Sequence, residues 1–444
     1  MPTGHRRRAR CLTVFLALGL LLSACASSGR GKVRSEPGGG TGSITIWAHE
    51  GQDSENRALR RAVEAFNASQ SDVKADLELI PGEDYTEMVA RTDVSDLPDV
   101  LEFDGPTLAN FVHSQKLAPL SWYVSVSTVA NATKAVQLQG TVGHQLYGLA
   151  MYDSGLGIYG NRKILDAAGV AYPTTLEDAW SAGDFTRALE DLAADDADGK
   201  VLDLREASGL ATEWGTYGFS PILWSAGGGL LDGSGKASGA LDSASVVAAF
   251  KTFQSWKPYA TPDPDAFARG GAALSWAGHW MYPAFHKALG DDLVVMPLPD
   301  FGNGPKTGQG SWSWGIGAAT KNGRAAGKFL DFLLNDENVT AMTEANGAPP
   351  ATVTGLDKSR LYGGKGPLRL FSEQLSAPCG SVITYVDTSC VATTRPAVVG
   401  YPVVTREFGK ALEAIHTGTE PGIALAGAAR AIDRALAEQD QTDR

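Results

Sequence analysis

The strongest constraint on the fold is the order of strand and helix patterns along the chain. Residues 44–47 alternate in character, residues 54–67 carry apolar side chains at helical spacing, and residues 73–80 alternate again. Residues 97–104 predict a third strand, which ends in an Asp-Gly-Pro turn suited to the start of a helix. This β-α-β order predicts a largely parallel sheet covered by helices.

A second unit of the same kind follows. Residues 156–159 predict a strand and residues 162–168 a helix, while Thr174 and Glu177 have capping-box spacing before another predicted helix. Later patterns predict a strand at 293–296 and helices at 243–257, 280–289, 324–335, 404–416 and 421–438. Two α/β units with a chain that returns to each favour a bilobed architecture, and 444 residues suffice for it.

The N-terminus predicts export. Four arginines precede the apolar residues 12–22, a run that is too short to span a bilayer and is typical of a secretory signal. Leu22-Ser-Ala-Cys25 then resembles the lipobox of bacterial lipoproteins, in which the cysteine becomes the first mature residue and carries the lipid. We therefore expect residues 1–24 to be a signal peptide and Cys25 to anchor the protein to the outer face of the membrane.

Two further predictions concern the exported chain. Residues 25–42 are rich in Gly and Ser after the cysteine and predict a flexible tether, with the folded part starting near Ser43. Cys379 and Cys390 are the cysteines that remain after Cys11 is removed and Cys25 is lipidated. In an oxidising compartment they favour a disulfide, although a two-cysteine metal site is an alternative.

Charge and motifs exclude several function classes. The chain has 38 Lys and Arg against 50 Asp and Glu, a net charge of −12, which repels phosphate backbones and argues against nucleic-acid binding. Its histidines are scattered without metal-ligand spacing, so no metal or cofactor is expected. The G-x-G-x-x-G match at 155–160 falls on a predicted strand, which argues against a dinucleotide site.

Several segments in a fixed order carry a resemblance to a known family. They are Ile44-Thr-Ile-Trp47, the Pro-Asp-Val strand that ends at Asp104, residues 146–163, Trp224-Ser-Ala-Gly-Gly, residues 272–280 and residues 295–299. Together they make the chain resemble the extracellular solute-binding proteins of ABC importers, specifically the maltose-binding-like, carbohydrate-binding family 1. The resemblance covers the chain from about residue 43 to its C-terminus.

The resemblance implies an α/β, two-lobed periplasmic-binding-protein-like fold of class II type, with a ligand cleft between lobes joined by hinge segments. Each lobe would comprise two segments, 43–152 plus 300–346 in lobe 1 and 156–296 plus 349–444 in lobe 2. The hinges would lie near residues 151–154, 297–299 and 347–350. Closure of the lobes would trap the ligand and present a closed shape to the importer.

Sugars require flat aromatic faces for their C–H groups and polar side chains for their hydroxyls. Trp312 lies in a Gly-rich loop with Gly310, and the family position places Trp280 near a helix start, facing the cleft. Trp47 and Trp224 match cleft segments of relatives, although core packing is the alternative for all of these tryptophans. We interpret the tryptophans at 122, 180, 214 and 256 as packing residues.

Polar candidates complete the predicted site. Asp104 ends a strand before a helix, the usual position of an α/β ligand site. Asp153 and Tyr152 lie at the predicted first crossing, Arg395 precedes Pro396, and Glu50 is a weaker candidate. The predicted ligand-binding residues are Trp47, Glu50, Asp104, Tyr152, Asp153, Trp224, Trp280, Gly310, Trp312 and Arg395.

The main hypothesis is a monomeric, non-enzymatic protein that captures a sugar or oligosaccharide and delivers it to an ABC importer permease. One alternative is a secreted glycosidase, which needs two suitably placed carboxylates. Another is a binding protein for a non-sugar solute such as a glycerophosphate ester. A phosphate would require basic side chains or a helix N-terminus, and the candidates offer mainly Arg395.

Overall fold

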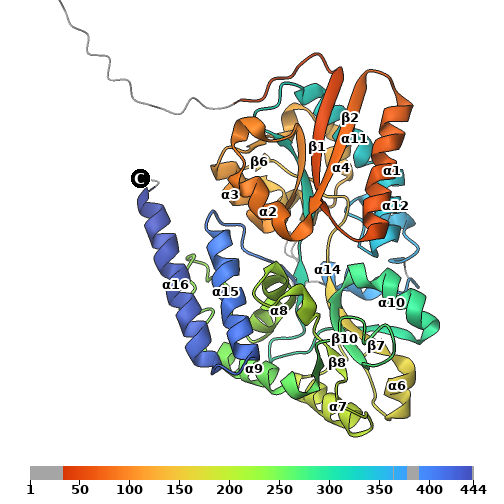
Figure 1. Cartoon of the computed structure of the whole chain (residues 1–444), viewed down its shortest axis with the longest axis vertical. Coiled ribbons are helices and arrows are strands. Elements are labelled where there is room, and N and C mark those ends of the chain that lie inside the picture. The colour runs from red at the N-terminus through yellow and green to blue at the C-terminus, as the bar shows by residue number, and fades with distance from the viewer. Residues whose placement is uncertain (1–33, 364, 378–389, 443–444) are drawn as a thin grey trace, which may run out of the picture. The chain divides into compact units, whose positions relative to one another are not determined.

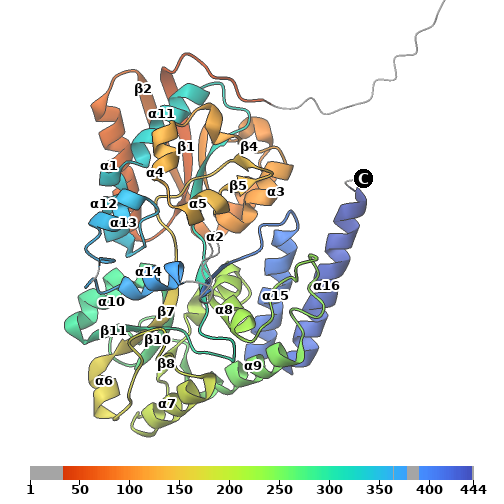
Figure 2. The ribbon, with the colours of Figure 1, turned by 180° about the vertical axis from the view of Figure 1, so that it is seen from behind.

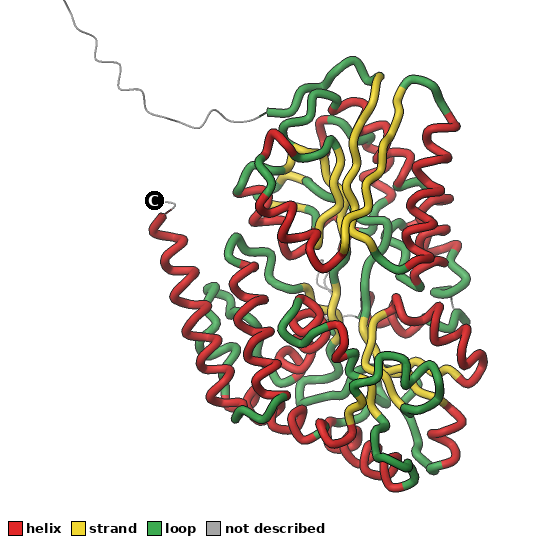
Figure 3. Tube along the Cα trace, viewed as in Figure 1, coloured by secondary structure: helices red, strands yellow, loops and turns green. Residues whose placement is uncertain are grey.

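The computed structural model describes residues 34–363, 365–377 and 390–442. Within this part, two five-stranded sheets, each with its own helices, form two lobes (Figures 1 and 3). The predicted signal peptide, Cys25 and Cys379 lie outside the described residues. The two-lobed α/β fold predicted from the sequence is confirmed.

Lobe 1 is built on a mixed sheet of order β2-β1-β3-β13-β4, in which β1, β2 and β3 are parallel and β13 is antiparallel to both neighbours. Its strands are β1 Gly42–Glu50, β2 Val73–Pro81, β3 Val100–Asp104, β4 Leu117–Ala118 and β13 Trp312–Gly317. Ile44 and Ile46 are fully buried and alternate with exposed Thr45, so the period-2 pattern reflects one face against helices.

Helices cover the lobe 1 sheet and complete its core. The helices are α1 Asp53–Ser69, α2 Gly82–Arg91, α3 Leu108–His113, α4 Val126–Asn131, α5 Lys134–Gln139, α11 Gly323–Leu333, α12 Asp336–Asn346 and α13 Val353–Lys358. Phe66 of α1 packs edge-on against Phe329 of α11, with ring centroids 5.3 Å apart. The chain thus returns to lobe 1 after building most of lobe 2.

Lobe 2 has a sheet of order β11-β7-β10-β8-β9. Its strands are β7 Leu156–Asn161, β8 Leu202–Asp203, β9 Ala260–Thr261, β10 Leu274–Gly278 and β11 Leu293–Met296. Every residue of β7 is buried between antiparallel β10 and β11. Because Ile158 and Tyr159 lie inside this strand, the glycines at 155–160 do not form a nucleotide-binding turn.

The helices of lobe 2 are α6 Arg162–Ala167, α7 Ala182–Ala194, α8 Glu213–Ser225, α9 Ala244–Ser255, α10 Tyr282–Leu289, α14 Arg369–Ser376, α15 Tyr401–His416 and α16 Pro421–Thr442. The two long C-terminal helices pack side by side, and α15 also contacts α8 (Figure 2). In the described part of the chain, no helix has the length and apolar character needed to cross a membrane.

The capping box predicted at Thr174 and Glu177 is wrong. Residues 171–180 contain no helix, and the capping box instead joins Ser181 and Asp184 at the start of α7. The Ser181 hydroxyl accepts from the Asp184 amide at 3.1 Å, and the Asp184 carboxylate accepts from the Ser181 amide at 3.1 Å. Buried apolar residues at helical spacing follow Asp184, and this is what distinguishes the true helix start.

The first crossing between the lobes follows the last backbone pairing of this segment with lobe 1. Leu149 still pairs with Trp314 of lobe 1, and the Asp153 amide donates to the Pro349 carbonyl at 2.8 Å. β7 of lobe 2 begins at Leu156. Residues 151–154 therefore span the gap between the two sheets.

The other two crossings lie later in the chain than predicted. The Phe301 amide donates to Ser225 of α8 at 2.7 Å, and β12 Thr307–Gln309 pairs with β14 Ala392–Thr394, so residues 300–309 belong with lobe 2. The chain crosses at 310–311, immediately before β13, instead of at 297–299. Backbone pairing of β12 in lobe 2 accounts for the difference.

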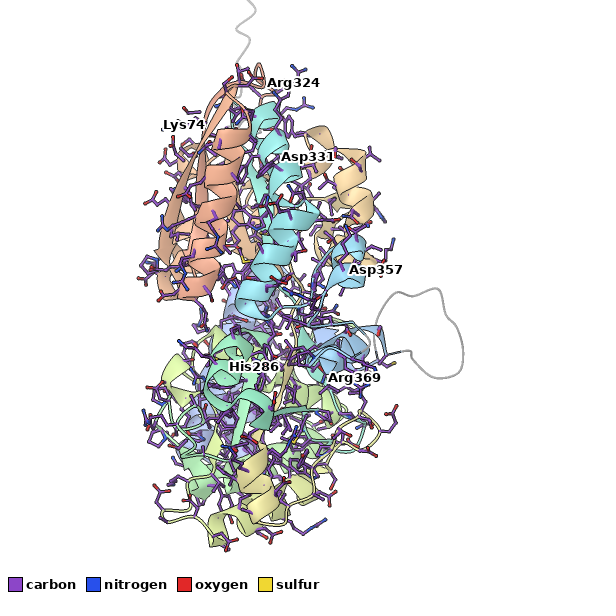
Figure 4. The ribbon with its side chains drawn as sticks, turned by 90° about the vertical axis from the view of Figure 1, so that its right-hand side faces the viewer. Lys74, His286, Arg324, Asp331, Asp357 and Arg369 are labelled. Atoms are coloured by element: carbon purple, nitrogen blue, oxygen red, sulfur yellow. The ribbon has the colours of Figure 1, made fainter. Side chains whose placement is uncertain are left out.

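The third crossing follows α13 instead of preceding it. The Thr133 amide donates to the Ala351 carbonyl at 2.8 Å, and the Thr354 hydroxyl to Asn131 at 3.0 Å, so α13 packs in lobe 1. In Figure 4, Asp357 of α13 lies on the side of lobe 1 and Arg369 at the start of α14 on the side of lobe 2. The predicted boundary at 347–349 is therefore too early.

The segment 34–41 differs from the predicted tether because it is bonded to lobe 1. The Gly323 and Arg324 amides donate to the carbonyls of Glu36 and Pro37 at 2.9 and 2.8 Å. These amides belong to the first turn of α11, where they have no partner within the helix. The segment stabilises this helix end despite its Gly-rich composition.

Candidate functional site

A cavity of about 490 Å³ lies between the lobes. Its lining from lobe 1 is His49, Gly51, Gln52, Glu55, Asp104, Trp312 and Asn346; from lobe 2 it is Arg205, Ser208, Glu213, Trp214, Tyr217, His279, Trp280 and Arg395; from the crossings it is Tyr152, Ser154, Gly310 and Ser311. His49 and Asp104 lie at the carboxyl ends of the parallel strands β1 and β3, where α/β folds place their ligands.

Six of the ten predicted ligand-binding residues line this cavity: Asp104, Tyr152, Trp280, Gly310, Trp312 and Arg395. They come from both lobes and both neighbouring crossings, over a sequence separation of nearly 300 residues. The structure thus brings together side chains that the sequence could associate only through the family resemblance. Trp47, Glu50, Asp153 and Trp224 do not line it.

Three of these four residues occupy other environments near the cleft. Trp47 is half-buried and packs in the core around Tyr85, whose hydroxyl donates to the Trp47 carbonyl at 3.1 Å. Glu50 is exposed at the last position of β1. Asp153 is buried inside the crossing, where it accepts from Gln309 Nε2 and the Ser154 amide at 2.8 Å each. Asp153 therefore organises the crossing segments without lining the cavity.

Helix α8 shows that the predictions for Trp214 and Trp224 were both wrong. Its first turns place Glu213, Trp214 and Tyr217 at the cavity. Trp224 lies eleven residues after Glu213, roughly 16 Å further along the helix axis at 1.5 Å per residue. Trp224 therefore does not reach the cleft, and Trp214, which we interpreted as a packing residue, does. A side-chain Cβ at Gly218 would lie 3.0 Å from the Trp214 ring, so glycine one turn later leaves room for it.

Lobe 2 contributes an aromatic cluster centred on Trp280. The Trp280 ring meets Trp214 edge-on at 6.0 Å and lies 6.0 Å from Tyr217 in a tilted arrangement. A Cβ at Gly278 would lie 2.1 Å from the Trp280 ring, so only glycine lets the ring fold back over the end of β10. The result is a set of partly exposed ring faces on one wall of the cavity.

Lobe 1 contributes a stacked pair. The rings of His49 and Trp312 are 3.8 Å apart and nearly parallel, at 10°. His49 Nδ1 also lies 2.7 Å from the Glu102 carboxylate. Burial is the largest single effect and lowers the pKa of His49, but the charge and hydrogen bond of Glu102, together with the charges of Glu55 and Asp104, raise this pKa above its ordinary value. His49 was not predicted, because a lone histidine at a strand end has no distinguishing sequence signal.

An ion pair joins the two lobes across the cleft. Arg395 of lobe 2 donates to both carboxylate oxygens of Asp104 in lobe 1, at 2.9 Å each, and also to Glu213. Burial is the largest single effect and opposes the charge on Arg395, but Asp104, Tyr401 and Glu213 together raise the pKa of the guanidinium well above its ordinary value. We predicted that Asp104 and Arg395 contact the ligand separately, whereas in the structure the two side chains form an ion pair with each other.

Glu213 and the Tyr217 ring hold the same guanidinium from the lobe 2 side. Glu213 accepts from the Thr405 hydroxyl at 2.6 Å and from the Tyr401 hydroxyl. Burial raises the pKa of Glu213 despite the adjacent guanidinium. The Arg395 guanidinium lies 4.7 Å above the centre of the Tyr217 ring, a cation–π geometry. Arg395 is therefore positioned by both lobes.

A second polar group lies at the hinge side of the cavity. Glu55 accepts from the Tyr152 hydroxyl at 2.8 Å and from Asn346 Nδ2 at 3.2 Å. His279 Nδ1 lies 3.1 Å from the Asn346 carbonyl, which can only accept, so Nδ1 carries the proton and Nε2 accepts from Ser154 at 3.3 Å. Burial lowers the pKa of His279 to about 4, so this ring is neutral at pH 7.

Metal chemistry has no evident site in the described residues, which contain no group of three or more His, Cys, Asp or Glu side chains able to hold an ion. The cavity instead combines ring faces from both lobes with carboxylates, amides and hydroxyls. Such an arrangement suits a ligand with apolar faces and a polar rim.

Comparison with known proteins identifies the family. Residues 61–357 match the sequence model of the family described as "Bacterial extracellular solute-binding protein", and the chain belongs to this family. It is 28% identical over 137 residues to the melibiose/raffinose/stachyose-binding protein MelE of Bacillus subtilis, a match that covers 30% of this chain and spans about a third of that protein, 31% of its length.

Solved structures share the fold. The GacH receptor of Streptomyces glaucescens superposes with a TM-score of 0.74 at 19% identity, over 89% of this chain and 98% of that one. The cyclic alpha-maltosyl-1,6-maltose binding protein of Arthrobacter globiformis has a TM-score of 0.70 at 21% identity, with the same coverage. The family implies that the protein is exported.

Proposed function

We propose that this protein captures a saccharide between its lobes and delivers it to the permease of an ABC importer. One observation carries the proposal: ring faces from both lobes, Trp280 with Trp214 in lobe 2 and Trp312 in lobe 1, line the same interlobe cavity as hydrogen-bonding side chains. The names of MelE and of the Arthrobacter globiformis protein, both sugar-binding, support a saccharide ligand.

The charges of the cavity favour a neutral saccharide over a phosphate ester. The Arg395 guanidinium is bonded to two carboxylates, and Arg205 lies 3.4 Å from Asp203 and donates to the Pro264 carbonyl at 2.6 Å. Among the described lining residues, both guanidinium groups thus already have acceptors. A phosphate would have to displace carboxylates from them.

The test is a thermal-shift screen with mono- and oligosaccharides, including melibiose, raffinose, stachyose, maltose and acarbose. A ligand that binds only the native state raises Tm, and titration calorimetry should then give a Kd in the micromolar range or below. Glycerophosphodiesters serve as the comparison set. A rise in Tm with a glycerophosphodiester and with none of the saccharides would contradict the proposal.

Binding without turnover is the second part of the proposal. Asp104 and Glu213 share one partner, because both carboxylates accept hydrogen bonds from Arg395. Engagement with this guanidinium favours a structural role for the pair over acid–base catalysis. Incubation of the purified protein with each bound saccharide should leave the saccharide intact by chromatography. New reducing ends would indicate a glycosidase.

We also propose that the protein is a monomer, lipid-anchored through Cys25 after removal of residues 1–24, with a disulfide between Cys379 and Cys390. The support for the anchor is the sequence pattern alone, because Cys25 lies outside the described residues. The disulfide is supported by the same pattern and by the bonded state of Cys390, although Cys379 lies outside the described residues. Thiol labelling of the unfolded, non-reduced protein should leave Cys379 and Cys390 unmodified, and light scattering should give the mass of one chain.

A further inference from the structure

A second cavity, of about 370 Å³, lies beyond the ion pair that joins the lobes. Among the described residues, it shares two lining residues with the first cavity, Gly310 and Arg395. These two residues therefore form the wall between the cavities. The rest of its wall comes from three places. In lobe 1 these are the turn Gly105–Thr107 before α3 and the helix α5, and in lobe 2 it is β14 with the residues that follow it.

The wall is fastened on both sides. The Arg395 side chain is 5% exposed and is held by Asp104 of lobe 1 and Glu213 of lobe 2. Gly310 passes close to it: a Cβ there would lie 3.3 Å from Arg395 Nη2, and the backbone φ of +142° favours glycine. A guanidinium fixed in this way blocks passage between the cavities.

The second cavity resembles the first in the chemistry that a sugar needs, with fewer charges. Its uncharged polar lining consists of the side chains of Gln139, Thr141, Gln309, Thr393 and Thr394. Proline rings and the half-exposed Leu138 supply apolar surface. Among its described lining residues, Arg395 is the one charged side chain. Neutral amides and hydroxyls next to apolar surface suit the hydroxyls and C–H faces of saccharide units.

We propose that the Arg395–Asp104 ion pair is a partition that divides one elongated saccharide cleft and restricts the protein to short saccharides. The first cavity alone falls in the lower half of the roughly 300–1,000 Å³ typical of small-molecule sites. With the partition removed, the added units of a longer saccharide occupy the second cavity. The inference rests on the proposed function and assigns Arg395 and Asp104 to selection by length.

The experiment compares affinities along a length series in wild type and in the double variant Arg395→Ala, Asp104→Ala. Removing both side chains avoids leaving Asp104 as an unpaired buried charge, and Glu213 keeps its hydrogen bonds from Tyr401 and Thr405. The probes are melibiose, raffinose, stachyose and verbascose, and maltose to maltohexaose, measured by titration calorimetry. Arg205→Ala is the matched control, since it removes a guanidinium from the first cavity away from the wall.

The wild-type protein should bind saccharides more weakly once they are longer than the first cavity can hold. The double variant should raise the ratio of longest-to-shortest affinity by at least about tenfold, equivalent to ~1.4 kcal/mol, while Arg205→Ala should change all lengths by a similar factor. Asp104→Asn, which keeps side-chain volume and loosens the guanidinium, is the second variant and should move the ratio in the same direction.

An unchanged length profile in both partition variants, with thermal transitions showing folded protein, would overturn the partition and leave saccharide binding intact. Failure of wild type to bind any member of either series or of the wider screen would overturn the proposed function, and the partition with it.

Discussion

At the scale of single residues, the role of each tryptophan follows from its surroundings in the fold, and its neighbours in the sequence do not reveal it. Trp256 and Trp276 are fully buried, whereas Trp280 and Trp312 line the interlobe cavity. Trp122 is 49% exposed, although we interpreted it as a packing residue. Core packing and ligand stacking use the same large ring, so the residue type alone does not separate the two roles.

Trp280→Ala should weaken saccharide affinity by at least about tenfold, ~1.4 kcal/mol, because it removes the ring at the centre of the lobe 2 aromatic cluster. Calorimetric titration with the saccharide found in the screen measures the effect. Trp122→Ala, outside the cavity lining, is the control and should leave affinity unchanged. Loss of folding in unliganded Trp280→Ala would instead assign the ring to the core.

His279 predicts a pH dependence of stability. Its pKa falls from an ordinary 6.5 to about 4 on folding because the ring is buried, so the unfolded chain binds a proton at a higher pH than the folded protein does. Stability attributable to His279 should therefore decrease as the pH falls from about 6.5 to 4, by roughly 2–3 kcal/mol in total.

The measurement is Tm against pH for wild type and His279→Gln, which should lose less stability over this interval. His286→Gln, an exposed histidine on α10 labelled in Figure 4, is the control and should retain the wild-type profile. Identical slopes for wild type and His279→Gln would contradict the assignment.

At the scale of elements, α8 shows how a helix start positions the site. Its N-terminal residue Glu213 bonds to Arg395, and Trp214 and Tyr217 follow at the cavity. The helix approaches the preceding loop so closely that a Cβ at Gly215 would lie 1.8 Å from the Leu210 carbonyl oxygen. Close approach of backbone to backbone is what this glycine permits.

Gly215→Ala should destabilise the fold by about 1–3 kcal/mol, because the first turn of α8 has to move away from Leu210. It should also weaken saccharide binding, since the same turn carries the lobe 2 lining. Gly427→Ala in α16 is the matched control: nothing lies within 4 Å of its Cβ position, and alanine in a helix interior should stabilise by about 0.5–1 kcal/mol. Urea unfolding measures both, and equal effects would contradict the role of the close approach.

At the scale of the whole molecule, the lobes are discontinuous in sequence. Lobe 1 takes β13, α11, α12 and α13 from the later part of the chain, and three crossings join it to lobe 2. Contacts across the cleft add to these crossings, such as the 2.9 Å ion pair between Asp104 and Arg395. Ligand that bridges the lobes therefore adds to interactions that already span the cleft.

Anchoring is the prediction that concerns the whole exported protein. Cys25→Ser should prevent lipid attachment, so the protein should appear in the medium in place of the membrane fraction. Fractionation with immunodetection measures this, and incorporation of labelled palmitate should be lost in parallel. Cys390→Ser is the control and should remain membrane-associated. Membrane association of Cys25→Ser equal to that of wild type would contradict the lipobox prediction.

From the sequence, local periodicity predicted the α/β class and the main strands and helices, since strands such as 44–47 and helices such as 54–67 bury one face at a fixed spacing. The six predicted residues that line the cavity were associated with one another through the family resemblance. The order of segments then identified the family, and the matched family model agrees.

Contacts between distant segments of the chain set which side chains meet in the cavity. Asp104 and Arg395, 291 residues apart, form one ion pair, and Trp214 reaches the cavity while Trp224 on the same helix does not. Two crossings lie later in the chain than predicted, at 310–311 and after α13. The reason is that backbone hydrogen bonds to distant segments hold β12 in lobe 2 and the residues before α13 in lobe 1. Such contacts join residues far apart in the chain, and no local spacing encodes them.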